Sequence, residues 1–507
     1  MYLREDDKIW IATGEDGTMP IYMLPKMMNR HGLVTGATGT GKTTTIKVMA
    51  EAFSEMGTAV FMADIKGDVS GLCKPGTPNA AVAERVESMG IENFTFTGFP
   101  VRFFDLFGES GIPVRTTVSA MGPILLARIL GLNETQTGVL QIIFRLADDN
   151  QLLLLDFKDL RAMVAYAGDN AKSFTTLYGN ISPQSVGAIQ RNLLLLEEAG
   201  GDRFFGEPEL DLNDWFGFDE YGRGVINILD CVALFQNPLL YSTFLLWMLS
   251  ALYELMPEVG DLDKPKLVFF FDEAHLLFTG APKALLQKIE QIVRLIRSKG
   301  IGIFFITQSP ADIPNTVLSQ LGNKVQHALR AYTPNDHKAI KAAANSFRPN
   351  PAFDSETAIS ELSTGEALVS ALDEKGAPQM IQRGYILPPR CSFDVAEPEL
   401  IEQLTKSSHL YTKYAQPFDR YSAFEVLEEA ANKQALERDQ AAQQAQQLKE
   451  EQLAAKATAT TKPAAPKAPA RRAAPSPMNR AVSSTLSQVG RSVSRELVRG
   501  IFGNIRK

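Results

Sequence analysis

Two hydrophobic patterns alternate along the chain. In one, three to six largely apolar or β-branched residues follow one another and lead to a polar or glycine-rich end. In the other, apolar residues recur every three or four positions. The first pattern predicts strands buried on both faces, and the second predicts helices that cover them. Runs of the first kind lie at 33–35, 59–64, 224–230, 267–273 and 302–308. Their alternation with helical segments predicts an α/β protein with a mainly parallel sheet.

The region from 113 to 200 has the helical pattern throughout, which predicts an all-helical insertion between strands of the core. Packing is the interpretation favoured for it. An uncharged stretch at 231–253 is interrupted by Asn237 and Pro238, which leaves about 15 residues before Glu254. A bilayer needs roughly 20 apolar residues, and a proline favours a helix start. We therefore predict a buried helix there and no stable membrane span.

The C-terminal third changes in character. Segments 366–372 and 379–387 predict a hairpin around Lys375 and Gly376. Residues 423–456 are rich in Ala, Gln and Glu, which predicts a helix with little apolar stripe. Residues 457–478 have the composition of a disordered linker. After it, apolar residues at three- and four-residue spacing and Arg491, Arg495 and Arg499 predict a basic amphipathic helix.

The strand predicted at 33–35 runs into a glycine-rich turn, and Lys42 then opens a helical run. This spacing, Gly-x-x-x-x-Gly-Lys-Thr, is that of the Walker A phosphate loop, in which backbone N–H groups and the helix N-terminus surround the phosphates of a nucleotide. Lys42 is expected to hold the β- and γ-phosphates of ATP, and Thr43 to coordinate Mg²⁺. The predicted nucleotide-binding residues are Gly36, Ala37, Thr38, Gly39, Thr40, Gly41, Lys42, Thr43 and Thr44.

The apolar run at 267–271 ends in Asp272 and Glu273, which is the Walker B pattern. Asp272 is expected in the Mg²⁺ shell, and Glu273 is expected to polarise the attacking water as general base. A strand next to both Walker motifs places Gln308 near the γ-phosphate, where it can orient water or sense hydrolysis.

Asp64, Lys66 and Asp68 follow the strand at 59–64, so they are accessory candidates at the same edge of the sheet. A solvated turn with a local ion pair is the alternative.

Composition is that of a globular protein, with 45% hydrophobic and 21% charged residues. Three distant cysteines favour a reducing compartment over a disulfide framework or zinc site, and the charged N-terminus is no secretory signal, so we expect a cytoplasmic protein. The formal net charge of −7 hides an asymmetry, because residues 462–507 carry ten basic side chains and one acidic one, leaving −16 on the first 461. DNA, an anionic membrane and an acidic groove on a protein are candidate partners of this tail, and docking onto protein is favoured.

Taken together, segments 36–43, 64–68, 271–275, 294–300 and 305–308 resemble the HerA–FtsK group of P-loop ATPases, and segment 320–330 is closer still to its YjgR-like bacterial HerA-like helicase-domain family. The resemblance spans about residues 5–395. It implies a RecA-like core, homo-hexamers and translocation on DNA. It also implies that Arg297 completes the site of a neighbouring subunit, with Arg294 and Arg330 as second choices. HerA itself carries a β-barrel ahead of its phosphate loop, whereas 35 residues precede Gly36 here.

The expected organisation has six parts. They are 1–110, the N-terminal part of a RecA-like ATPase core, with a strand or two of residues 1–30 beside the nucleotide; 111–215, the helical insertion; 216–400, the rest of the core; 401–456, a helical extension; 457–478, the linker; and 479–507, the basic helix. The expected function is a Mg²⁺-ATP-driven, hexameric DNA translocase. An ATP-driven motor acting on a protein partner and a nucleotide switch that assembles a ring remain as alternatives.

Overall fold

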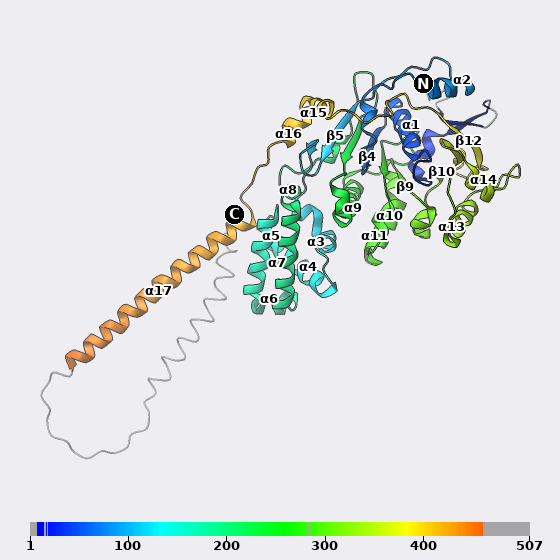
Figure 1. Cartoon of the computed structure of the whole chain (residues 1–507). Coiled ribbons are helices and arrows are strands. Elements are labelled where there is room, and N and C mark those ends of the chain that lie inside the picture. The colour runs from blue at the N-terminus through cyan, green and yellow to red at the C-terminus, as the bar shows by residue number, and fades with distance from the viewer. Residues whose placement is uncertain (1–7, 15–16, 18, 282, 460–507) are drawn as a thin grey trace, which may run out of the picture. The chain divides into compact units, whose positions relative to one another are not determined.

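A computed structural model describes residues 8–14, 17, 19–281 and 283–459, and within these the chain forms two units (Figure 1). The first unit comprises Met1–Thr137 and Arg191–Asp419, and the second comprises Gly138–Gln190 and Arg420–Lys507. The expected linker beyond residue 459 and the expected basic helix at 479–507 lie outside the described residues.

One sheet of twelve strands organises the described part of the first unit, in the order β2-β1-β12-β11-β10-β3-β9-β8-β4-β7-β5-β6. The eight strands from β10 to β6 in this order are parallel, and β11, β12, β1 and β2 add an antiparallel edge. The strands are β1 (Ile9–Gly14), β2 (Pro20–Met23), β3 (Gly32–Thr35), β4 (Ala59–Asp64), β5 (Val101–Asp105), β6 (Ile112–Pro113), β7 (Ile226–Asp230), β8 (Leu267–Phe271), β9 (Ile301–Thr307), β10 (Asn323–Gln326), β11 (Glu366–Ser370) and β12 (Gln382–Ile386).

The described helices of the first unit are α1 (Lys42–Glu55), α2 (Ala80–Ser88), α3 (Val118–Ile129), α8 (Asp202–Phe204), α9 (Pro238–Leu255), α10 (His275–Phe278), α11 (Lys283–Leu295), α12 (Asn315–Leu318), α13 (Pro334–Asn345), α14 (Ser355–Glu361), α15 (Pro398–Ser407) and α16 (His409–Tyr414). The second unit holds α5 (Phe157–Asp169), α6 (Ala171–Tyr178) and α17 (Ala423–Ala459). Helices α4 (Glu134–Asp149) and α7 (Pro183–Leu196) each contribute residues to both units.

The central strands are buried on both faces, as their apolar runs predict. In β8, Phe270 lies on the face covered by α1, with its ring centroid 6.1 Å from that of Phe53. The neighbouring Phe269 lies on the opposite face, where its ring centroid is 5.0 Å from that of Phe61. Alternate side chains of one strand therefore enter two apolar layers, which explains why the run has no polar position.

The fold confirms the mixed α/β architecture with a mainly parallel sheet and places β9 between β3 and β8, as the Walker motifs require. The predicted hairpin is β11–β12, and the uncharged stretch forms the buried helix α9, which begins at Pro238 with Asn237 as its N-cap. None of the described helices is long and apolar enough to cross a membrane.

Two segments lie differently from the expectation. Strands β1 and β2 form, but β12, β11 and β10 separate β1 from β3, because β1 pairs with the hairpin strand β12 and not with the central sheet. They are therefore not beside the nucleotide loop. The region expected as a helical insertion contributes β6 to the edge of the sheet, because Ile112 pairs with Phe104 of β5.

Candidate active site

The glycine-rich turn joins β3 to α1 and has the backbone that its glycines allow. Gly36, Gly39 and Gly41 all have positive φ, and Gly41 is the N-cap of α1. A Cβ on Gly36 would lie 2.5 Å from the Cβ of His327, so this position excludes any side chain. The hydroxyl of Thr40 donates to the carbonyl of Ala37 at 2.7 Å and closes the turn on itself. Of the other predicted residues of the turn, Thr38 is exposed and Thr44 is half-buried at the first turn of α1.

The side chain of Lys42 is buried under this turn. Its Nζ donates to the carbonyl oxygens of Gly36 at 2.6 Å and Ala37 at 3.1 Å. Burial, followed by the nearby charge of Lys66, lowers the pKa of Lys42, while carboxylates near it act in the opposite direction. The ammonium group therefore lies in the concave side of the loop, where an anion would stabilise its charge.

A second cluster lies where β4 and β8 end, at the same edge of the sheet. The Thr43 hydroxyl donates to Oδ2 of Asp68 at 2.9 Å. The Nζ of Lys66 lies 3.1 Å from Oε1 of Glu273 and 3.6 Å from Oδ2 of Asp272. Burial raises the pKa of Asp272, and Lys66 opposes this shift. The structure thus brings together the two Walker motifs and the accessory residues Lys66 and Asp68.

Asp64 stabilises the turn that carries Lys66 and Asp68. Its carboxylate accepts hydrogen bonds from the backbone N–H groups of Gly67 (2.8 Å), Asp68 (3.2 Å) and Val69 (3.1 Å). Burial, with the charge of Asp68 as a second cause, raises the pKa of Asp64 to about 7 although these bonds act to lower it. Its geometry is that of a residue shaping the turn that presents Lys66.

Glu273 is held in an unusual conformation. Its φ is 45°, which is rare for a residue with a side chain and costs on the order of 1–2 kcal/mol. The following N–H, of Ala274, donates to the carbonyl of Ile306 in β9 at 2.9 Å, and the Tyr241 hydroxyl of α9 donates to the carbonyl of Asp272 at 2.8 Å. Glu273 is 7% exposed, and its Oε2 makes no hydrogen bond within the described residues, although Nδ1 of His275 lies 3.4 Å from it. A buried carboxylate oxygen is thereby left available to a ligand or water.

Gln308 follows β9 directly and is exposed at this same edge. The residue before it, Thr307, donates its hydroxyl to Oδ2 of Asp312 at 2.7 Å, which anchors the turn that carries Gln308. Because β9 lies between β3 and β8, Gln308 stands between the phosphate loop and Asp272 in strand order.

Arg297 lies at the amino ends of the parallel strands, whereas the phosphate loop lies at their carboxyl ends. It belongs to the 3₁₀ helix Ile296–Lys299, which leads into the amino end of β9, and its charge contributes to lowering the pKa of His31, the residue before β3. The seven residues of β9 separate it from the phosphate loop of its own chain, roughly 20 Å at strand geometry. Arg294, in the last turn of α11, is exposed beside it. The structure therefore does not bring these arginines to their own site.

Arg330, the other alternative to Arg297, makes hydrogen bonds to backbone carbonyl groups of its own chain. Its guanidinium donates to the carbonyls of Ser360 and Leu362, the latter at 2.9 Å. It thereby holds the segment between α14 and β11 against the end of β10.

Sequence reasoning missed a group of buried polar residues behind the phosphate loop. The Thr45 hydroxyl of α1 contacts Nε2 of His327 at 2.8 Å, and Nδ1 of His327 donates to the carbonyl of Glu366 at 3.0 Å. Burial lowers the pKa of His327 to about 4, which keeps the imidazole neutral. Beside it, the Thr35 hydroxyl donates to Oε1 of Gln326 at 2.6 Å. A histidine ending a short strand 290 residues from the loop carries no local signal of this role.

The residues present fit Mg²⁺ and a nucleotide. Among the described residues, no three His, Cys, Asp or Glu side chains form a metal cage of their own. Mg²⁺ in P-loop proteins is held by one hydroxyl, one carboxylate, waters and phosphate oxygens, so no such cage is required. Thr43 and Asp272 supply those two ligand types, and the turn around Gly36–Gly41 supplies the concave surface for phosphates.

Comparisons with known proteins agree with this geometry. A sequence model of the family described as helicase HerA-like C-terminal matches residues 11–507. A probable helicase of Methanocaldococcus jannaschii is 33% identical over 125 residues, 24% of this chain and 22% of that protein. The DNA double-strand break repair helicase HerA of Sulfolobus acidocaldarius is 20% identical over 384 residues, 72% of this chain and 66% of that protein. The chain thus spans between about a fifth and two thirds of these relatives.

Among solved structures, the plasmid coupling protein TrwB in complex with a non-hydrolysable ATP analogue has a TM-score of 0.50 to this chain at 15% identity. The match covers 76% of this chain and 92% of TrwB. This likeness shows a shared fold.

Proposed function

The chain belongs to the helicase HerA-like C-terminal family, and from this premise we propose that it is a Mg²⁺-dependent ATPase that moves along DNA as a hexameric ring. One observation supports the ATPase most strongly. At the carboxyl ends of β3, β8 and β4, Thr43 of the phosphate loop contacts Asp68, and Lys66 of the same turn contacts Asp272 and Glu273. A coincidental glycine turn would not have these partners.

In the proposed reaction, the backbone of the turn and Lys42 bind the ATP phosphates, so that Lys42 exchanges the carbonyls of Gly36 and Ala37 for phosphate oxygens. Thr43 and Asp272 would hold Mg²⁺, which would supply neutralisation of the phosphate charge. Glu273 accepts the proton of the attacking water through Oε2, which makes no hydrogen bond in the described structure, and Gln308 orients that water.

The ring follows from the position of Arg297. Arg297, at the amino ends of the parallel strands, is remote from the phosphate loop of its own chain. It is available to a neighbouring copy arranged head to tail. In P-loop ATPases an arginine supplied by a partner stabilises the transition-state charge. We therefore assign Arg297 to the site of the adjacent subunit.

The proposal that this motor moves along DNA rests on the family and on the named activity of the HerA relatives. A second candidate, a motor that acts on a protein partner, is favoured by charge, because the first 461 residues carry −16 and would repel phosphates.

Steady-state ATPase of the purified chain, with and without double- and single-stranded DNA at low and moderate salt, separates these two functions. Strong stimulation that fades with salt is expected for DNA translocation, because salt weakens phosphate contacts. Hydrolysis indifferent to DNA favours the protein-directed motor. Tight ATP binding with negligible hydrolysis would contradict both and leave a nucleotide switch.

Two variants test the chemistry itself. Lys42→Ala should lose nucleotide affinity, whereas Glu273→Gln should keep affinity and lose turnover by about 10²-fold or more, as expected for loss of a general base. Equal turnover in the Glu273→Gln variant would remove Glu273 as the base.

A further inference from the structure

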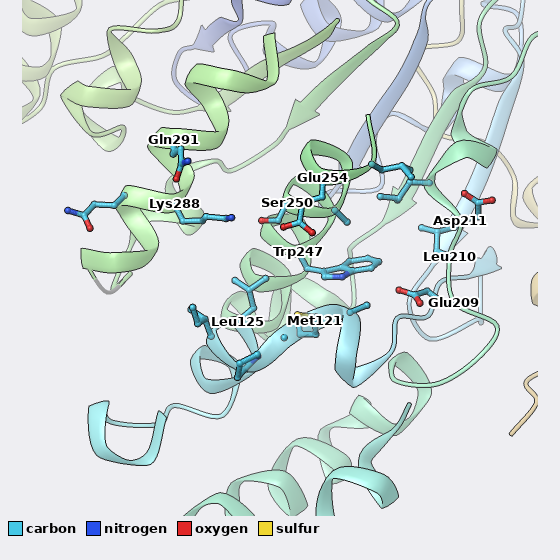
Figure 2. A pocket seen from close by; sticks show the side chains of 18 residues that line it. Met121, Leu125, Glu209, Leu210, Asp211, Trp247, Ser250, Glu254, Lys288 and Gln291 are labelled. Atoms are coloured by element: carbon cyan, nitrogen blue, oxygen red, sulfur yellow. The ribbon is translucent and has the colours of Figure 1, made fainter. Parts of the chain in front are cut away.

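A groove in the first unit lies apart from the nucleotide residues. It has a volume of about 910 Å³ and is lined by α3, the segment 209–212, the C-terminal half of α9 and the middle of α11 (Figure 2). None of the lining residues belongs to the Walker motifs or to the cluster around Lys66.

The lining is largely apolar and partly open to solvent. Helix α3 is kinked at Gly122, which has a φ of 73°, and Pro123 follows it. Beyond the kink, Ile124 is 56% exposed, and on the opposite wall Leu255, the last residue of α9, is 46% exposed. Large apolar side chains that gather in one groove indicate a surface that a partner covers.

The base of the groove contains an unsatisfied donor. The indole of Trp247 lies among the lining residues, between α3 and α11 (Figure 2). It is 3% exposed, and its Nε1 has no hydrogen-bond partner within the described residues. A buried N–H without an acceptor costs about 1–3 kcal/mol, which an occupant with a hydroxyl, amide or carbonyl group would recover.

The charges on the walls are mainly negative. Glu209, Asp211 and Glu254 line the groove, and Lys288 is the single cation in its lining among the described residues. Glu254 and Asp211 are exposed, so their carboxylates face solvent. An occupant should therefore combine apolar side chains with positive charge.

We propose that the C-terminal segment of this chain, residues 482–505, docks in this groove, either in its own chain or in a neighbouring copy. Its sequence has the required features. Apolar residues recur at 482, 486, 489, 493, 497, 501 and 505, arginines stand at 491, 495 and 499, and proline is absent from 479 onward. Serine and glutamine side chains within it, such as Ser487 and Gln488, offer acceptors for the Trp247 N–H. Helix-in-groove recognition uses this spacing.

Residues 460–481 connect α17 to the segment, and 22 residues span up to roughly 70 Å when extended. The docking is independent of the proposed ATPase, because the groove shares no residue with that site.

Hydrogen–deuterium exchange of the full-length chain tests the proposal. The variant Arg491→Glu/Arg495→Glu/Arg499→Glu reverses the charge of the segment, and Arg471→Glu/Arg472→Glu is the matched control outside it. Peptides that cover 118–129 and 247–255 should exchange several-fold faster in the triple variant than in the wild type and the control. Equal exchange in all three proteins would overturn the proposal.

Photocrosslinking gives a second measurement that does not depend on charge. Benzoylphenylalanine placed at Leu255 of the full chain should crosslink to peptides within 480–507. A crosslink within one chain indicates docking in the same copy, and a crosslinked dimer indicates docking in a neighbour. Crosslinks exclusively to other parts of the chain, or to none, would show that something else covers the groove and would refute the assignment.

Discussion

Asp272 and Glu273 are adjacent carboxylates in a largely buried place, and two like charges in such a place repel each other. Lys66 lies within 3.6 Å of both and stabilises their ionised forms, and its own pKa is raised because these carboxylates and Asp68 together outweigh the effect of its burial. Lys66 comes from the turn after β4 and not from either Walker motif. It therefore links Glu273, the proposed general base, to a loop that also contacts Thr43 through Asp68.

Replacement of Lys66 by methionine should raise the pKa of Asp272 further, because the nearby positive charge that opposes the effect of burial is lost. The acidic limb of the pH–kcat profile is expected to move to higher pH by about one unit, the lower end of the range for a close charge, since Lys66 is partly exposed. Lys74→Met is the control, because Lys74 pairs with Glu397 (2.7 Å) on another surface. An unchanged acidic limb would contradict this effect of Lys66 on Asp272.

The neutral histidine behind the phosphate loop makes stability depend on pH. The folded pKa of His327 is about 4, against 6.5 for an unburied imidazole, so this stabilising contribution is present above pH 6.5 and is lost as pH falls toward 4. Between pH 7.5 and 5 the loss amounts to about 2 kcal/mol by linkage. Buried Asp64 and Glu51, with pKa values raised to about 7, act in the opposite direction.

His327→Gln should therefore be less stable than the wild type at pH 7.5, with the difference narrowing by about 2 kcal/mol at pH 5. Urea unfolding of both proteins at the two pH values measures this, because the contributions of Asp64 and Glu51 cancel in the comparison. A difference that stays constant with pH would mean that His327 is protonated in the folded state.

At the scale of elements, the parallel strands place the proposed nucleotide-binding residues at one end and Arg297 at the other. Their carboxyl ends carry the phosphate loop, Asp272 and Gln308, while α11 returns the chain to their amino ends and leaves Arg297 there.

In the second unit, α17 is fixed at its start by α5. Asp159 is fully buried and accepts hydrogen bonds from Leu155 N (2.8 Å), Ser422 Oγ (2.5 Å) and Phe424 N (2.9 Å).

Asp159→Ala should release the start of α17 from α5, because the hydrogen bonds from Ser422 and Phe424 lose their common acceptor. Amide exchange over residues 420–430 is expected to accelerate by about tenfold or more, since each lost bond to a charged group costs about 1.5–3 kcal/mol. Asp169→Ala, at the exposed end of the same helix, is the matched control. Protection that persists in Asp159→Ala would mean that apolar contacts hold α17 without this carboxylate.

At the scale of the whole molecule, the proposed site is shared between copies. One copy supplies Lys42, Thr43, Asp272 and Glu273, and its neighbour supplies Arg297. Head-to-tail contacts of this kind close into rings when the rotation permits, so activity should depend on assembly.

Mixing Arg297→Ala with Lys42→Ala subunits should restore activity that neither variant has alone. In an equal mixture, a site is complete when an Arg297→Ala copy supplies Lys42 and a Lys42→Ala neighbour supplies Arg297, which is about a quarter of all sites in a ring of random composition. ATPase assays of the mixture measure this fraction. Mixing Lys42→Ala with Glu273→Gln is the control and should give no rescue, because both residues act in one copy. No rescue in the first mixture would contradict an arginine acting between subunits.

Local patterns in the sequence determined much of this protein. The apolar runs predicted β4, β7, β8 and β9, and the glycine spacing from Gly36 to Gly41 predicted the turn, because burial on both faces of a strand and the backbone angles of a turn are set by residue types close together in the chain. The two Walker motifs were legible for the same reason.

The tertiary structure decided what distant segments do to one another. The pairing of β1 with β12, the support of Thr45 by His327 and the contact of Lys66 with Glu273 join segments separated by about 200 residues or more. Burial and strand order set these contacts, and neither is encoded in the spacing of a single segment. The same holds for Arg297, whose place at the amino edge of the sheet depends on the direction in which α11 returns the chain to β9.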